Sequence, residues 1–194
     1  MSAATFYFDL GSPYAYLSAE RISSLFTEAG VEQPEWQPVL LGGLFAHFDR
    51  GSWSQTPARE EGIAEIERRA AEYGLPPIVW PDPWPGNTLL AMRAATFAKQ
   101  TGRTVSFALA AFRQAFAGGR DLTDPDNVVI SAAAIELHPR AVLKATGTAV
   151  VKDALREATD AAAAAGVFGV PSLVVDGEVF WGDDRLEEAI EAAS

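Results

Sequence analysis

The stretch FYFDLGSPYAYL, residues 6–17, places a Gly-Ser-Pro turn between an aromatic run and an apolar helical pattern. The β-branched and aromatic residues at 5–9 predict a strand that is buried on both faces. Ser12 then stands at an N-cap position, and Pro13 suits the first position of a helix. We expect that helix to run to about residue 29, because Gly30 is a typical helix stop. The pattern therefore predicts a strand that delivers Ser12 to the N-terminus of a helix.

The rest of the chain returns to β structure only near its end. A second strand is expected at about 35–40, and residues 170–181 predict two strands joined by a turn at Asp176-Gly177. The segment between them predicts helices, interrupted by the proline-rich residues 76–87. Caps, stops and apolar spacing place these helices at about residues 57–73, 88–100, 103–117, 125–135 and 148–165, with a short one after His138-Pro139 and a final one after Gly182-Asp183-Asp184.

The predicted order of elements is β-α-β, a block of helices, and then helix-β-β-α. Without the helical block, the order becomes β-α-β-α-β-β-α, which is that of the thioredoxin fold. We therefore predict an α/β protein in which residues 1–41 and 148–194 form a thioredoxin-like domain and residues 42–147 form an inserted all-helical domain. The length of 194 residues suits one domain, or one domain with a large insertion.

Composition and charge exclude several kinds of chemistry. The chain contains no cysteine, so disulfides, cysteine metal ligands and reactions at a protein thiol are excluded, and any sulfur must arrive on a ligand. Its formal charge of −11 disfavours nucleic acid as a partner. The N-terminus does not resemble a signal peptide, and no apolar run approaches the ~20 residues of a membrane span. We expect a soluble cytoplasmic protein with no metal, nucleic acid or membrane partner.

Two interpretations of Ser12 follow from its position. As an N-cap, its oxygen accepts an amide hydrogen bond and stabilises the helix by about 1 kcal/mol. As part of a site, its hydroxyl lies where the partial positive charge of a helix N-terminus favours an anion such as a thiolate. Neither of the two histidines can be placed beside Ser12 from the sequence, so no general base is evident. Among the chemical roles, donation to an incoming thiolate is therefore favoured over nucleophilic attack. The local sequence by itself favours the cap.

Other candidate residues also have both a structural and a functional interpretation. Pro171 can simply open a strand, where a missing N–H costs little. Asp183 and Asp184 can cap the last helix or bind the ammonium group of a ligand. Asn87 can cap a helix or line a pocket, and the tryptophans that precede it, Trp84 among them, can wall that pocket or cover the helical core.

Two further features favour ordinary structure. The acidic residues and the arginine pair at 60–69 fit a solvent-exposed helix face. The glycine pairs at 42–43 and 118–119 lack the strand and helix context that a phosphate-binding loop requires. We assign no catalytic role to either.

Three blocks of this sequence resemble a known family. FYFDLGSPYAYLSAERI, residues 6–22, resembles the opening of the 2-hydroxychromene-2-carboxylate isomerases and of the kappa-class glutathione transferases. WPGNTLLAMRAA, residues 84–95, looks like their Pro-x-Asn-Thr/Ser segment, and GVFGVPSLVVDGEVFWGDDRLE, residues 166–187, is similar to their C-terminal signature. The blocks occur in the family's order along the whole chain. The resemblance implies a DsbA-like thioredoxin fold with an inserted helical domain.

The resemblance also implies a glutathione-dependent enzyme that is a homodimer. Ser12 would be the catalytic residue, holding the glutathione sulfur as a thiolate. The backbone of Val170, beside a cis proline, would pair with the tripeptide, and the acidic pair would bind its γ-glutamyl end. The implied cofactor-binding residues are Asn87, Val170, Pro171, Asp183 and Asp184. Residues 49–62 depart from the family pattern on the substrate side, which leaves the hydroxychromene substrate open. The first acidic position is often neutral in relatives, and the alanine-rich, lysine-poor composition is typical of a GC-rich genome, so mycothiol is an alternative cofactor.

The implied reaction is an isomerisation. The thiolate adds to an electron-poor conjugated carbon of an aromatic substrate, which allows ring opening and bond rotation, and is then expelled. Trp53 and Trp84 are expected to line the substrate pocket. A kappa-type transferase, which keeps the sulfur on its product, is an alternative. A second alternative is a non-catalytic protein that binds an extended peptide, in which Ser12 is only a cap.

Overall fold

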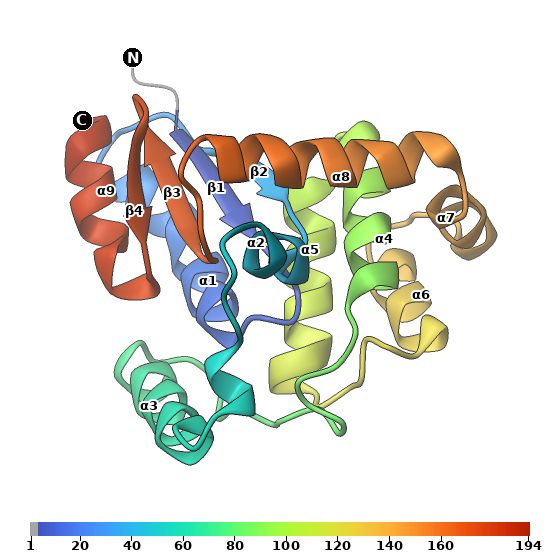
Figure 1. Ribbon diagram of the computed structural model, residues 1–194, viewed down its shortest axis with the longest axis horizontal. Helices are drawn as coiled ribbons and strands as arrows, with labels where there is room; N and C mark the ends of the chain where they lie inside the picture. Colours follow the sequence, from blue (N-terminus) through green and yellow to red (C-terminus); the bar gives the residue numbers. More distant parts are fainter. Residues whose placement is uncertain (1–3) are drawn as a thin grey trace.

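The computed structural model describes residues 4–194 and is built around a four-stranded sheet in the order β2-β1-β3-β4 (Figure 1). Strands β1 and β2 are parallel, whereas β3 is antiparallel to β1 and to β4. The N-terminal strand β1 and the strand β3 from the C-terminal part of the chain therefore lie side by side in the middle of the sheet. The strands are β1 (Ala4–Phe8), β2 (Glu35–Pro38), β3 (Ser172–Val175) and β4 (Glu178–Trp181).

The helices complete the predicted order of elements. Helix α1 (Pro13–Glu28) follows β1, and α9 (Leu186–Ala193) follows β4 through a 3-10 turn (Asp183–Arg185). Between β2 and β3 lie α2 (Leu41–His47), a 3-10 turn (Trp53–Gln55), α3 (Arg59–Glu72), α4 (Leu89–Gln100), α5 (Thr104–Phe112) with its π-helical continuation (Arg113–Ala117), α6 (Pro125–Ala133), α7 (Pro139–Thr146) and α8 (Ala149–Ala164).

Alternation along β1 divides the core into two parts. Phe6 and Phe8 point to one face, where they pack with residues of α1, α9 and the helices α4 and α5; Phe8 and Phe112 lie 6.0 Å apart between ring centroids. Tyr7 points to the other face, which packs against α2 and α8. Because both faces of β1 are covered, its carboxyl end is held firmly, and the Ser12 turn begins there.

Most of the inserted helices, α4 to α7, lie beyond the β2 edge of the sheet (Figure 1). Helix α3 is separate from these helices and lies near α1. The first core cluster contains residues of α1, α9 and the helical block together, so the sheet and the block share one apolar interior. The division into residues 1–41 with 148–194 and residues 42–147 therefore stays a prediction.

The structure differs from the predicted elements in a few places. Helix α2 was not anticipated, because its Gly-Gly pair is unfavourable within a helix. The predicted helix at 103–117 changes to a π-helix at Arg113, and the helix expected to reach residue 135 ends at Ala133. His138 caps α7 with its ring nitrogen in addition to ending the preceding segment.

Candidate active site

Ser12 caps α1, which is one of its two interpretations, and its expected contact with a thiolate stays a prediction. It is 5 % exposed, and its Oγ accepts a hydrogen bond from the Ala15 N–H at 3.2 Å, so Ser12 is the N-cap of α1. The same oxygen can donate to the Val170 carbonyl oxygen, 3.4 Å away. The Val170–Pro171 peptide bond is cis. The fold thus brings together two of the predicted site segments from opposite ends of the chain.

The acidic pair is fixed beside this contact. The Gly182 N–H donates to the Pro171 carbonyl oxygen at 3.0 Å, which holds the start of the 183–185 turn next to the cis bond. Gly182 has a φ of 116°, a conformation that residues with a Cβ rarely adopt. A glycine at this position therefore allows the chain to leave β4 and place Asp183 and Asp184 near Ser12.

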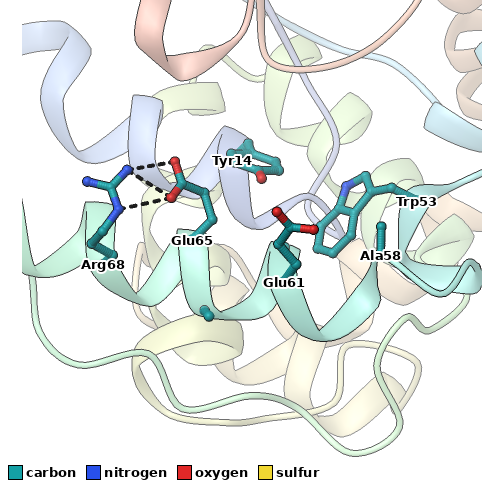
Figure 2. A pocket seen from close by; sticks show the side chains of 8 residues that line it. Tyr14, Trp53, Ala58, Glu61, Glu65 and Arg68 are labelled. Carbon is teal, nitrogen blue, oxygen red and sulfur yellow. Dashed lines mark hydrogen bonds and ion pairs between the residues drawn. The ribbon is translucent and has the colours of Figure 1, made fainter.

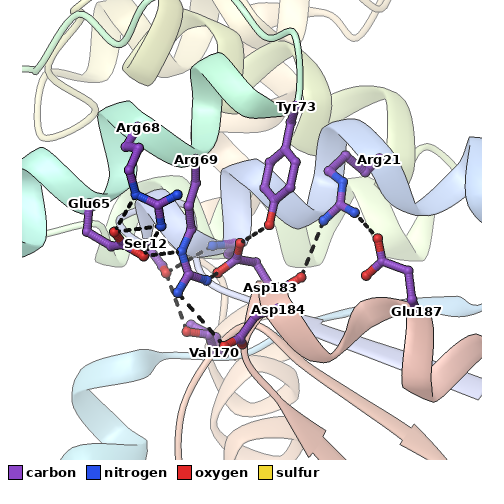
Figure 3. Close-up of polar contacts among 11 residues, drawn as sticks. Ser12, Arg21, Glu65, Arg68, Arg69, Tyr73, Val170, Asp183, Asp184 and Glu187 are labelled. Atoms are coloured by element: carbon purple, nitrogen blue, oxygen red, sulfur yellow. Dashed lines mark hydrogen bonds and ion pairs between the residues drawn. The ribbon is translucent and has the colours of Figure 1, made fainter.

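Asp183 is not a helix cap. Neither the 183–185 turn nor α9 has a side-chain cap, and Asp183 instead binds α3: Oδ1 accepts from Arg69 at 2.8 Å and Oδ2 accepts from the Tyr73 hydroxyl at 3.0 Å (Figure 3). Asp183 is only 1 % exposed. Burial raises the pKa of its carboxyl group, and the Arg69 charge and the Tyr73 hydrogen bond oppose that rise. The capping interpretation of Asp183 was therefore wrong.

Asp184 faces solvent. Its side chain is 60 % exposed, and its Oδ2 lies 3.8 Å from Arg69. Of the two carboxylates, Asp184 is the one with room to contact a ligand, whereas Asp183 is already bonded on both oxygens.

The charges at 60–69 are not only a surface face. Glu65 binds both Arg68 and Arg69, and these hydrogen bonds lower the pKa of Glu65 to about 2. The Arg69 guanidinium binds Glu65 on its own helix and Asp183 in the turn before α9 (Figure 3). The expectation of a purely exposed face was wrong because one arginine of the pair points toward the sheet domain.

A buried carboxylate that the sequence did not single out supports the Ser12 turn. Asp9, 2 % exposed, follows β1, and its Oδ1 accepts from the Gly11 N–H at 2.8 Å and the Thr88 hydroxyl at 2.9 Å. Its Oδ2 accepts from the Leu41 N–H at 2.8 Å. Burial raises the pKa of Asp9, and these three hydrogen bonds oppose the rise. Asp9 therefore ties the Ser12 turn to the starts of α2 and α4.

Asn87 lies at the start of α4 and is exposed. Its Oδ1 accepts from the Leu89 N–H at 3.0 Å, but the N-cap position of α4 belongs to Thr88, whose hydroxyl donates to Asp9 and not to the helix. Through Thr88 and Asp9, Asn87 belongs to the loops that meet at Ser12. Its expected contact with a cofactor stays a prediction.

The tryptophans form a continuous aromatic wall. The Trp84 indole donates to the Gly11 carbonyl oxygen at 3.2 Å, immediately before Ser12. The Trp84 ring centroid lies 5.6 Å from that of Trp53, which in turn lies 5.9 Å from Tyr14 on α1. The Trp80 ring lies 4.5 Å from Trp84 between centroids, tilted by 52°, and also contacts the helical core through Phe116. The ring of Trp84 therefore lies between the core and the Ser12 turn.

A cavity of about 510 Å³ adjoins this wall, between the start of α1 and the side of α3 that carries Glu61 and Glu65 (Figure 2). Trp53 forms one side and lies flat on Gly62, where a Cβ would come within 2.2 Å of the ring, so only glycine fits. Trp53 thus lines this pocket and Trp84 does not, and their expected contact with a substrate stays a prediction. The lining residues are Tyr14, Trp53, Ala58, Glu61, Gly62, Ala64, Glu65 and Arg68.

Residues 4–192 match the family of DSBA-like thioredoxin domains. The chain belongs to this family. The DsbA-like thioredoxin fold predicted from the sequence is therefore confirmed. This DSBA-like chain nevertheless has no cysteine among its 194 residues, and Ser12 occupies the turn that opens its first helix.

Relatives of this DSBA-like domain include an isomerase. The 2-hydroxychromene-2-carboxylate isomerase of Sphingobium xenophagum is 27 % identical over 188 residues, which cover 94 % of this chain and 93 % of the relative. A solved 2-hydroxychromene-2-carboxylate isomerase superposes with a TM-score of 0.86 at 22 % identity, covering 98 % of this chain and 93 % of the other. The resemblance stated from the sequence is confirmed, and the expectation of an enzyme agrees with these relatives.

A more distant structure shares the fold. The cytosolic disulfide reductase DsbM from Pseudomonas aeruginosa, solved with GSH, superposes with a TM-score of 0.67 at 11 % identity over 98 % of this chain and 95 % of the other. Within residues 4–194, none of the helices combines the length and the apolar character of a membrane span. The cytoplasmic location and the homodimer stay predictions.

Proposed function

We propose that this protein is an isomerase that uses a bound low-molecular-weight thiol, glutathione in the first instance and mycothiol as the alternative, on a conjugated aromatic electrophile. The observation that supports this most directly is the Ser12 hydroxyl at the N-terminus of α1, beside the Val170 carbonyl, in a chain similar over 94 % of its length to an isomerase. The thiol would supply a nucleophilic sulfur, which this chain lacks.

The residues at the start of α1 suit a thiolate. The helix N-terminus carries a partial positive charge and N–H groups that point toward an anion. The Ser12 hydroxyl can turn from the Val170 carbonyl, a long contact at 3.4 Å, to donate to the sulfur. Together these groups stabilise the thiolate over the thiol. Asp9 holds the turn in place by bonding the Gly11 N–H.

The remaining predicted residues suit the other parts of a tripeptide thiol. The backbone of Val170 would pair with the peptide bonds of the ligand, next to Pro171. Asp184, being exposed, would make the direct contact with the ligand's ammonium group, and Asp183 would keep the turn positioned through Arg69. The substrate ring would lie against the aromatic wall of Trp53 and Trp84.

The first experiment is a titration of the protein with reduced glutathione, mycothiol and S-methyl glutathione, read by calorimetry and by thiolate absorbance. Because the protein contains no cysteine, every thiolate signal belongs to the ligand. We expect the free thiol to bind more tightly than the methylated form, and its pKa to fall on binding. Binding of mycothiol alone would keep the reaction and change the cofactor. Absence of binding by both thiols would refute the proposal and favour the peptide-binding alternative.

Two Ser12 variants separate the cap from the chemistry. Ser12→Thr keeps a hydroxyl and a cap, whereas Ser12→Ala removes both. A hydrogen bond to a charged group is worth about 1.5–3 kcal/mol, so Ser12→Ala should raise the pKa of the bound thiol by about 1–2 units. Products distinguish isomerase from transferase, because the transferase consumes one thiol per turnover. If the pKa of the bound thiol in Ser12→Ala equals that in the wild-type protein, Ser12 has no role in stabilising the thiolate.

A further inference from the structure

The 510 Å³ cavity beside the aromatic wall has the size of a small-molecule site. Tyr14, two residues after the N-cap of α1, and Trp53 form its apolar sides. Trp53 connects through Trp84 to the Gly11 carbonyl, so the cavity and the Ser12 turn share one wall. A ring bound in the cavity therefore lies within the same aromatic surface that reaches Ser12.

The charged groups of the cavity come from α3 and are mainly acidic. Glu61 and Glu65 rise from the side of α3 that faces Tyr14 (Figure 2). Arg68 is the cation in the lining, and its guanidinium is bound by Glu65 and by Glu72. The positive charge of Arg68 is thus already neutralised before a ligand enters.

Glu61 differs from Glu65 in its surroundings. Within residues 4–194, no hydrogen bond or ion pair joins the Glu61 carboxylate to another side chain, whereas Glu65 binds two arginines. Arg59, also on α3, lies outside the lining: it donates to the Trp84 carbonyl oxygen, with its guanidinium 5.5 Å from the Trp84 ring centroid. Among the described residues, Glu61 is therefore a carboxylate without a side-chain partner beside Trp53, whereas the Tyr14 ring already has a cation near it, with the Arg69 guanidinium 5.7 Å from its centroid.

We infer that this cavity selects conjugated electrophiles that are uncharged or carry a positive group, and disfavours anionic ones, with Glu61 as the residue that sets this preference. The inference rests on the proposed function, since the cavity is taken as the place of the electrophile. Aromatic faces attract cations, and a carboxylate beside them attracts a cation and repels an anion. The substrate would thus differ in charge from the carboxylate that the name of the relative specifies.

The experiment uses cis-configured aryl enones that are identical except at the para position, which carries a carboxylate, a carboxamide or a trimethylammonium group. The carboxamide has nearly the shape of the carboxylate without its charge. With glutathione or mycothiol present, conversion to the trans isomer is followed and kcat/KM is compared. We expect the wild-type protein to prefer the carboxamide to the carboxylate by about fivefold, because Glu61 is exposed and water screens a single charge interaction there.

Variants of α3 assign that preference. Glu61→Gln should reduce the ratio to about twofold, and Glu61→Lys should reverse it. Glu60→Gln is the matched control, because Glu60 is the adjacent glutamate and is exposed like Glu61 but lies outside the lining, so its ratio should equal that of the wild type. A wild-type preference for the carboxylate, or an unchanged ratio in Glu61→Gln, overturns the inference.

Failure of the proposed function is recognised separately. If no enone is converted and no thiol binds, the function is wrong, and the three probes are then titrated alone by tryptophan fluorescence, with Trp53→Phe to identify the cavity. The charge preference would be supported without the reaction if the trimethylammonium probe bound most tightly and the carboxylate probe least tightly, and if these differences in affinity became smaller in Glu61→Gln. Equal binding of the three probes, or no binding, would overturn it.

Discussion

Arg69 is the residue whose removal tests most of the site at once. Its guanidinium bonds Asp183 at 2.8 Å and also binds Glu65, so it joins α3 to the turn before α9. Replacing it as Arg69→Met keeps an aliphatic side chain and removes the guanidinium, which lies 5.7 Å from the centroid of the Tyr14 ring. Asp183 would then be a buried carboxylate with the Tyr73 hydroxyl as its remaining side-chain partner.

The size of the effect follows from burial. Breaking a fully buried ion pair by removing one partner costs about 3–5 kcal/mol. Asp183 is 1 % exposed, but the Arg69 side chain is 20 % exposed, so water can partly replace the guanidinium. We therefore expect Arg69→Met to lower the free energy of unfolding by about 2–3 kcal/mol at neutral pH. Because α3 carries one side of the cavity, KM for the electrophile should rise as well.

The loss should depend on pH in a defined direction. Burial already raises the pKa of Asp183 above its ordinary value, and loss of Arg69 raises it further. A carboxyl group whose pKa is raised in the folded protein stabilises the fold below its unfolded pKa and loses that contribution as pH rises through the folded pKa. The cost of Arg69→Met should therefore be largest at neutral pH and shrink in acid, where Asp183 takes up a proton.

Urea unfolding, followed by circular dichroism at several pH values, measures the loss. The adjacent Arg68→Met is the control: Arg68 is 53 % exposed and pairs with Glu65 and Glu72 on its own helix, so the change should leave the free energy of unfolding nearly unchanged. A double-mutant cycle of Arg69→Met with Asp183→Asn should give a coupling above about 1 kcal/mol. Equal losses for the two arginine variants, or a coupling near zero, would refute the reasoning.

Three further outcomes are expected. Asp9→Asn removes one carboxylate oxygen, so the Leu41 N–H or another donor to Asp9 loses its acceptor, and the free energy of unfolding should fall by about 1–3 kcal/mol at neutral pH. Because the pKa of Asp9 is raised in the folded protein, the difference in free energy of unfolding between wild type and variant should become smaller as pH rises from acid. A difference that does not change with pH would contradict this. Gly62→Ala should displace the Trp53 ring, which a Cβ would meet at 2.2 Å, and shift tryptophan fluorescence with less cavity binding, whereas an unchanged spectrum would show that the ring is not seated there. Ser12→Ala should cost about 1 kcal/mol in urea unfolding, and Ser12→Asn, which keeps a cap, only a few tenths; equal losses would contradict the cap.

The parts of the fold that the sequence predicted depend on neighbours in the chain. The N-cap at Ser12 and the hairpin turn at Asp176-Gly177 are written within a few residues of sequence, and the structure contains both. The order of strands and helices followed from such local signals. Helix α2 was missed because its glycines oppose helix formation locally, and it is held by packing on α8 and by the bond from its Leu41 N–H to Asp9.

The parts of the site that escaped prediction depend on contacts between distant segments. Asp9 looks like any polar residue after a strand, and only the folded chain brings Thr88 to its carboxylate. Resemblance to a family supplied Val170 and the acidic pair, but not the partners of that pair. The sequence therefore indicated which segments meet at Ser12, but not the hydrogen bonds and ion pairs that hold these segments together.

Arg68 and Arg69 show why these contacts between segments could not be predicted from the sequence. Both follow Glu65 at spacings of three and four residues, and both form the intrahelical pair that such spacing favours. Successive residues of a helix differ by about 100° around its axis, so one arginine turns outward to Glu72 while the next reaches Asp183. The local pattern is the same for both residues, and only the position of α3 beside the turn before α9 distinguishes a surface charge from the one that holds the site together.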